Sequence, residues 1–180
     1  MPEPNADADG RILSTTHRAR PLNVLVLCTG NSARSIMAEV IFNQLGSGRV
    51  RAYSAGSHPR GEVHPLTLAE LRRRRLSVDG LRSKGWEVFA ASDAPRMDLV
   101  VTVCDSAAAE ACPVWPGAPI QVHWGVSDPA SVEGDEATRR MAFAETFERL
   151  SARVGALCRL PLERMDSDAL RRAAEFLQGE

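Results

Sequence analysis

Short apolar runs alternate with longer stretches of helical periodicity along most of the chain. Residues 23–27 form an apolar run rich in β-formers, and from Ile36 onward apolar residues recur at spacings of three and four. This pattern predicts a buried strand followed by a helix over 35–45. Further strands are predicted over 49–54, 97–103 and 119–123, and further helices over 64–76, 135–157 and 166–177. Because strands alternate with helices, we expect an α/β fold of three layers, with a four-stranded parallel sheet and helices on both faces.

The same pattern predicts which side chains are buried and where the domain ends. The long helix over 135–157 carries an apolar stripe that we expect to be buried, made of Met141, Phe143, Phe147, Leu150 and Val154. A chain of 180 residues has the size of one domain. Residues 1–20 lack apolar periodicity, so we predict a mobile tail there, a domain over 21–160, and a helical extension over 161–180 that packs on or beside it.

Composition and charge exclude several classes of protein. The 22 basic and 23 acidic residues nearly balance, so no nucleic acid and no membrane partner is expected, and the arginines at 72–75 are interpreted as a solvated helix surface. The chain has no apolar run of about 18 residues and no secretory signal, which predicts a cytoplasmic protein. It has neither a Cys-x2-Cys motif nor a His pair at helical spacing, so no metal site is expected.

The loop between the first predicted strand and helix carries the most informative chemistry. Its sequence, CTGNSAR, begins with Cys28 and ends with Arg34. A Gly/Asn/Ser loop that enters a helix N-terminus builds a nest of N–H groups for an oxyanion, and Gly30 and Asn31 tolerate the positive φ that such a loop needs. The helix N-terminus and Arg34 both favour a thiolate, so we expect a depressed pKa and a nucleophilic Cys28. The predicted oxyanion-binding residues are Thr29, Gly30, Asn31, Ser32, Ala33, Arg34 and Ser35.

Two further candidates follow other strands of the predicted sheet. Cys104 follows the strand over 97–103, and Asp128 follows the strand over 119–123. Because the carboxyl ends of parallel strands share one edge, both are expected on the side that carries the Cys28 loop. Asp128 precedes a proline, so it is either a turn residue or a general acid that protonates the oxygen expelled when a thiolate attacks an oxyanion.

The remaining cysteines leave more than one interpretation open. In a chain without a signal, four cysteines favour catalytic or redox thiols over a disulfide framework. Cys104 and Cys112 lie eight positions apart across an alanine-rich spacer. A helical spacer would hold the two sulfurs too far apart for a disulfide, whereas an unwound one would let either sulfur reach Cys28. Both can also be small apolar core residues, and Cys158 is expected to pack rather than react.

The segment VLVLCTGNSARSIMAE resembles the phosphate loop of the low-molecular-weight protein tyrosine phosphatase superfamily, and within it the bacterial arsenate reductases most. The segments GLRSKGWEVF (80–89) and VTVCDSAAAEACPVWPG (101–117) are similar to the reductase branch, and HWGVSDPA (123–130) resembles the family's general-acid loop. The similarity covers residues 21–160. It implies the family's α/β fold and an enzyme in which Asp128 is the general acid.

The resemblance further implies thiol-dependent reduction of arsenate, with phosphate or sulfate as competing anions. Cys28 would form the arsenic adduct, and Cys104, Cys112 or a glutathione-type thiol would resolve it. No bound cofactor is implied, because thioredoxin or a glutaredoxin would act as external reductant. The family's cysteine pair is commonly one residue closer together than Cys104 and Cys112.

A phosphatase acting through a phosphocysteine remains the main alternative. The family's phosphatases carry a cysteine where Ala33 stands here, and tend to carry a tyrosine at the place of Ala130. The chain has one tyrosine, Tyr53. The other aromatic side chains that could stack on a phosphotyrosine ring are Trp115 and Trp124. These features favour the reductase. A non-catalytic anion-binding module would need neither nucleophile nor acid, and a papain-like hydrolase would need a His base that nothing pairs with Cys28.

Overall fold

The computed structural model describes residues 18–110 and 113–179. Within them a single parallel sheet has the strand order β2-β1-β3-β4. Its strands are β1 (Leu22–Cys28), β2 (Val50–Gly56), β3 (Leu99–Thr102) and β4 (Ile120–His123). The predicted strands and their parallel direction are confirmed. Their carboxyl ends share one edge, so the segments that follow Cys28, Gly56, Thr102 and His123 meet there.

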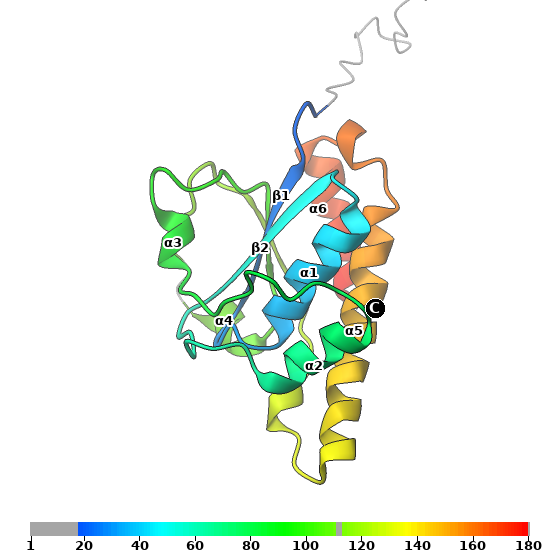
Figure 1. Cartoon of the computed structure of the whole chain (residues 1–180). Helices are drawn as coiled ribbons and strands as arrows, with labels where there is room; N and C mark the ends of the chain where they lie inside the picture. Colours follow the sequence, from blue (N-terminus) through cyan, green and yellow to red (C-terminus); the bar gives the residue numbers. More distant parts are fainter. Residues whose placement is uncertain (1–17, 111–112, 180) are drawn as a thin grey trace, which may run out of the picture.

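Helices cover the sheet unequally. The helices are α1 (Arg34–Gly46), α2 (Pro65–Arg73), α3 (Glu87–Ala90), α4 (Asp105–Ala109), α5 (Glu136–Cys158) and α6 (Ser167–Phe176), with short 3-10 turns at Pro129–Ser131, Leu162–Arg164 and Leu177–Gly179. Figure 1 shows α1, α2, α5 and α6 on one face and the short α3 on the other. The predicted α/β fold of three layers is therefore confirmed. The four-residue α3 was not predicted from the sequence, because it is too short to show a helical period.

The alternation of side chains in β1 divides the core in two. Val24 and Val26 face the larger core, which lies under α1, α5 and α6, whereas Leu25 and Leu27 face a smaller one built around Phe89, Met97 and Trp115. Every residue of β3 is buried, as expected for a central parallel strand covered on both faces. The sheet is thus a rigid platform for the loops at its carboxyl edge.

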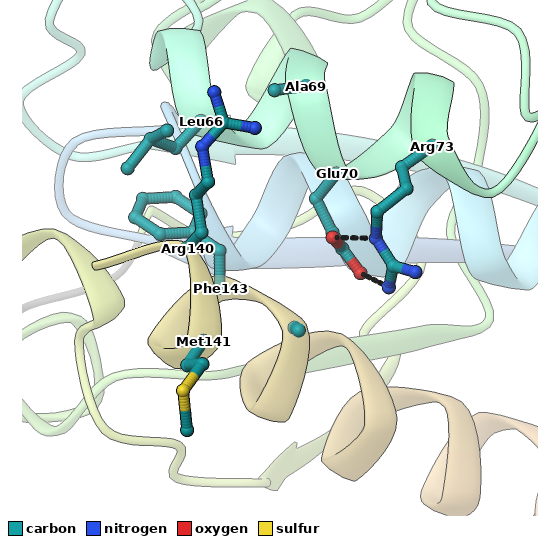
Figure 2. A pocket seen from close by; sticks show the side chains of 8 residues that line it. Leu66, Ala69, Glu70, Arg73, Arg140, Met141 and Phe143 are labelled. Carbon is teal, nitrogen blue, oxygen red and sulfur yellow. Dashed lines mark hydrogen bonds and ion pairs between the residues drawn. The ribbon is translucent and has the colours of Figure 1, made fainter. Parts of the chain in front are cut away.

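The apolar stripe of α5 is confirmed except at one end. Phe143, Phe147, Leu150 and Val154 are buried, but Met141 is 62% exposed. The prediction for Met141 was wrong because it lies two positions from Phe143, and residues two apart on a helix point in nearly opposite directions. In Figure 2 the Met141 side chain points away from α2.

Contacts between residues that are far apart in the sequence fix both ends of the described chain to the sheet region. Arg18 and Arg20 each form an ion pair of 2.8 Å with Asp98, whose Oδ2 also accepts the N–H of Asn23. At the other end, Trp124 Nε1 donates to the carbonyl oxygen of Ala174 in α6. The division into tail, domain and extension stays a prediction, and residues 1–17 of that tail lie outside the described residues. Over residues 18–110 and 113–179, the structure holds no helix that is both long and apolar enough to span a membrane.

Candidate active site

The Cys28 loop joins β1 to α1 and turns sharply around the sulfur atom. Asn31 has a φ of 41°, and this left-handed conformation aims its N–H at Cys28 Sγ, 3.1 Å away. Ser35, in the first turn of α1, places its Oγ 2.9 Å from the same sulfur. Positive φ at Asn31 was predicted. Gly30 was expected to tolerate positive φ as well, but it is not among the described residues that adopt it.

The outer side of the loop is held by the segment between β2 and α2. The carbonyl oxygens of Thr29 and Gly30 accept the N–H groups of His58 and Arg60, and the carbonyl oxygen of Ser32 accepts the N–H of His64. These bonds measure 2.9, 3.0 and 2.9 Å. Because the carbonyls are engaged outward, the loop can present N–H groups to an anion without repelling it.

Asn31 anchors the loop through a buried polar network. Its Nδ2 donates to Ser35 Oγ and Ser54 Oγ, both at 2.9 Å, and its Oδ1 accepts the backbone N–H of Lys84 at 2.8 Å. Ser54 in turn donates to Glu39 Oε2, which lies 3.7 Å from Lys84 Nζ. Asn31, Ser35 and Ser54 are fully buried. Such a satisfied network fixes a single loop conformation.

The pKa of Cys28 is not depressed as predicted. Burial of the side chain, which is 3% exposed, raises the pKa of the thiol. Hydrogen bonds from Ser35 and from the Asn31 N–H lower it again, but they do not outweigh the burial. The prediction was wrong because it counted the charge of Arg34 in favour of the thiolate and ignored the cost of burying that thiolate.

Arg34 is engaged with the loop that carries Asp128. Its Nη1 donates to the carbonyl oxygen of Val126 at 3.0 Å, and its Nη2 lies 3.3 Å from Asp128 Oδ2. Asp128 Oδ1 accepts the N–H of Ala130 at 3.1 Å, so the carboxylate also caps the Pro129–Ser131 turn. The interpretation of Asp128 as a turn residue is confirmed, and its role as a general acid stays a prediction. The cation and the candidate acid stand together beside Cys28.

Cys104 contacts the Cys28 loop directly. Its Sγ lies 3.5 Å from Thr29 Oγ1 and accepts the N–H of Ala107 at 3.4 Å, as the N-cap of α4. A cavity of about 430 Å³ opens beside it and is lined by Arg34, Cys104, Asp105, Ser106, Gly125, Val126, Ser127 and Asp128. The spacer after Cys104 is helical for only five residues. Cys112 lies outside the described residues, and Cys158 is buried at the end of α5.

A second cavity, of about 270 Å³, opens directly over the nucleophile. It is lined by Cys28, Thr29, Gly30, Ser32, Ala33, Arg34, His58, Arg60, Asp128 and Ala130. His58 and Arg60 were not predicted as site residues from the sequence. The signal for both was their position just after the second strand, at the same sheet edge that identified Cys104 and Asp128. Ser54 and Glu39 were missed because only the tertiary fold brings them to Asn31.

The hollow between α2 and α5 offers no comparable chemistry. Figure 2 shows its lining: Phe143 of α5 lies below Leu66 of α2, and the Arg140 side chain extends from α5 up to beside Leu66. Its volume is about 260 Å³. Glu70 is paired there with Arg73, and Arg140 with Glu136, so the charged groups are already neutralised. Within residues 18–110 and 113–179, no three His, Cys, Asp or Glu side chains gather in a way that would hold a metal ion.

Together these features define a class of site: a cysteine in an anion-binding loop of the Cys-x5-Arg type, with an aspartate across the cavity. A family model for the low molecular weight phosphotyrosine protein phosphatase matches residues 23–171. The chain belongs to that family of enzymes. The family match and the fold agree with the resemblance that the sequence shows.

Curated relatives and a solved structure that are about one-third identical to this chain are arsenate reductases. The arsenate reductase of Bacillus cereus (strain Q1) is 36% identical over 129 residues, which are 71% of this chain and 92% of that protein. The arsenate reductase of Shouchella clausii (strain KSM-K16) is 33% identical over 131 residues, covering 73% and 91%. The crystal structure of the arsenate reductase from Archaeoglobus fulgidus DSM 4304 has a TM-score of 0.55 and 33% identity, covering 73% of this chain and 98% of that one.

Proposed function

We propose that this protein reduces arsenate to arsenite, with Cys28 as the nucleophile and Cys104 as the first resolving thiol. The observation that carries the proposal is the contact between Cys104 Sγ and Thr29 Oγ1 at 3.5 Å. It puts a second thiol on the wall of the loop that begins with the nucleophile. A phosphatase has no use for such a thiol, whereas a reductase needs one within reach of the adduct. The identities with arsenate reductases support the same choice.

In the first step, the Cys28 thiolate attacks arsenic and a sulfur–arsenic bond forms. Arg34 and the loop N–H groups hold the oxyanion's charge. Asp128, 3.3 Å from Arg34, has to be protonated for this step; it then gives its proton to the departing oxygen, which leaves as water, and is left as the carboxylate. Ser35 and the Asn31 N–H, both hydrogen-bonded to Cys28 Sγ, stabilise the thiolate before attack.

In the second step, the resolving thiolate attacks Cys28 Sγ. A sulfur–sulfur bond forms and the sulfur–arsenic bond breaks, with its electron pair passing to arsenic. Arsenic is thereby reduced from the +5 to the +3 state and leaves as arsenite. The two thiols together lose two electrons and become a disulfide between Cys28 and Cys104.

The disulfide has to be reduced before the next turnover. Cys112 can take over the disulfide from Cys104, or a glutathione-type thiol can resolve the adduct directly. Thioredoxin or a glutaredoxin would supply the two electrons. Because such reductants keep thiols reduced in the cytoplasm, we propose that the protein acts there.

Phosphatase activity is the second candidate, because the nucleophile, the arginine and the aspartate also serve phosphoester hydrolysis. The cavity over Cys28 favours the reductase. Its lining includes Ala33, Ala130, His58 and Arg60, and among the described lining residues no Phe, Tyr or Trp is present to stack on a phosphotyrosine ring.

The decisive experiment measures arsenite released from arsenate by the wild type and by Cys104→Ala, Cys112→Ala and Cys158→Ala. Each protein is assayed with thioredoxin and, separately, with glutathione plus glutaredoxin. Cys158 is a matched control, because it is buried like Cys104 but lies at the far end of α5. We expect loss of thioredoxin-driven turnover in Cys104→Ala and its retention in Cys158→Ala.

Two outcomes would overturn the proposal in different ways. Turnover that is unchanged in Cys104→Ala with thioredoxin as well as with glutathione plus glutaredoxin would show that Cys104 is not the resolving thiol. No arsenite under either reductant, together with rapid cleavage of para-nitrophenyl phosphate, would establish a phosphatase.

A further inference from the structure

Arg60 is fixed beside the Cys28 loop by its own backbone. The N–H groups of His58 and Arg60 donate to the carbonyl oxygens of Thr29 and Gly30 at 2.9 and 3.0 Å. The segment after β2 therefore runs alongside the Cys28 loop, with His58 bonded to Thr29 and Arg60 bonded to Gly30. The Cα of Arg60 is held in register with the anion-binding loop, although the side chain itself is exposed.

The Arg60 side chain crosses the loop at Gly30. A Cβ built on Gly30 would lie 3.2 Å from Arg60 Nε and 3.3 Å from Arg60 Cγ. A side chain at position 30 would therefore push the guanidinium away. This close approach, rather than a positive φ, is what Gly30 permits. It brings Arg60 to the wall of the cavity that Cys28, Arg34 and Asp128 also line.

Without Arg60, the cavity offers little net positive charge to a bound anion. Arg34 is paired with Asp128 at 3.3 Å, so the two together contribute little net charge. Arsenate and phosphate carry between one and two negative charges near neutral pH, and the Cys28 thiolate that forms for the attack adds another. Among the described residues, none places a carboxylate within ion-pair distance of Arg60. Its charge is thus available to an anion in the cavity.

We propose that Arg60 is a second anion-binding residue, which makes the Cys28 loop select doubly charged tetrahedral oxyanions over singly charged ones. This inference deepens the proposed function and rests on its anion pocket. Arg34 stabilises charge that develops during the reaction, whereas Arg60 at the rim captures and holds the incoming dianion. Its removal should therefore raise the dissociation constant and KM, with little change in kcat.

The test titrates the protein with sulfate and with inorganic phosphate while the backbone amide resonances of residues 29–35 are followed by NMR. The variants are Arg60→Ala, Arg60→Lys and Arg51→Ala. Arg51 is a matched control, because it is an exposed arginine on β2 that does not line the cavity. At about pH 8 we expect Arg60→Ala to weaken both anions about tenfold, Arg60→Lys to weaken them about threefold, and Arg51→Ala to change neither.

Changing pH separates charge recognition from shape recognition. Sulfate stays doubly charged at about pH 5.5, whereas phosphate is then mostly singly charged. The effect of Arg60→Ala should persist for sulfate and become small for phosphate. Dissociation constants within twofold of the wild type for both anions at about pH 8 would overturn the proposal.

Anion binding and arsenite formation are measured separately, so the role of Arg60 and the proposed function can fail independently. If the wild type binds phosphate but forms no arsenite, the reductase proposal fails while the role of Arg60 is still measured. The amide spectrum also reports whether Arg60→Ala is folded. If it is not, Arg60→Gln, which keeps most of the side chain's bulk without its charge, gives the same comparison.

Discussion

The hydroxyl of Ser35 lies 2.9 Å from the sulfur of Cys28, and its oxygen also accepts a hydrogen bond from Asn31 Nδ2. When Cys28 is a thiolate its sulfur can only accept, so Ser35 is then the donor of this hydrogen bond. Burial raises the pKa of Cys28, and the bond from Ser35 is the largest of the contributions that lower it. The reactivity of the nucleophile therefore depends on a neutral hydroxyl in the first turn of α1.

Replacing Ser35 by alanine should raise the pKa of Cys28 further. The thiolate would lose a charge-assisted hydrogen bond, which contributes about 1.5–3 kcal/mol in proteins, so we expect at least a tenfold slower reaction with iodoacetamide near neutral pH. The measurement is the pH profile of Cys28 alkylation, followed by mass spectrometry. Ser92→Ala, an exposed serine in the loop after α3, should leave the profile unchanged. A profile that does not move in Ser35→Ala would contradict this role.

Gly56 at the end of β2 should tolerate no side chain. A Cβ there would lie 2.3 Å from the carbonyl oxygen of Thr29 and 3.0 Å from the backbone nitrogen of Asn31. Because both contacts are with backbone, the loop itself would have to move. We expect Gly56→Ala to reduce turnover by about a hundredfold or more, since displaced catalytic groups cost that much. Turnover within threefold of the wild type would show that the loop can shift without loss.

Gly155 gives the matched control for that substitution. It lies inside α5, where a Cβ would come no closer than 3.4 Å, to the flexible end of Arg159. Alanine is preferred to glycine in a helix interior by about 1 kcal/mol. Gly155→Ala should therefore keep full activity and raise the free energy of unfolding by about 0.5–1 kcal/mol, measured by chemical denaturation.

Asp128 should affect the chemical step more than binding. Asparagine keeps the oxygen that accepts the Ala130 N–H, but it has no proton to give to the leaving oxygen. General acids contribute about 10²–10⁴-fold to rates, so Asp128→Asn should lower kcat by about a hundredfold or more. KM should change little, which separates this residue from Arg60. Rapid-quench measurement of the first turnover tests whether the loss lies in adduct formation, and an unchanged first turnover would exclude the role.

The sequence predicted the part of the site that is local in the chain. The apolar run, the turn residues and the helical period around Cys28 are neighbours, so they defined β1, the loop and α1 to within a residue or two. Parallel topology then sufficed to bring Cys104 and Asp128 to the same edge. The parallel order of the strands fixes this placement, whatever the side-chain contacts are.

What the sequence could not show depends on burial and on contacts that the fold creates. Asn31 reaches Ser54 and Lys84, which lie 23 and 53 positions further along the chain. No local pattern marks such partners. The direction of the Cys28 pKa shift depends on how deeply the thiol is buried and on the hydrogen bonds that it receives from Ser35 and Asn31. Both are properties of the tertiary structure alone.

The ion pairs at the amino end of β1 should make stability depend on pH. Burial raises the pKa of Asp98, but hydrogen bonds from Arg20 and Asn23 and the charges of Arg18 and Arg20 outweigh it, so the pKa is held below its usual value. A carboxyl group with a lowered folded pKa stabilises the protein above its unfolded pKa, and that stabilisation is lost as the pH falls through the folded value. Asp98→Asn should therefore cost about 2 kcal/mol of unfolding free energy at pH 7. The difference from the wild type should shrink below about pH 4. Urea denaturation across this range is the measurement, with the exposed Asp93→Asn as control; a difference independent of pH would mean that packing, and not the charge of Asp98, holds this end of the sheet.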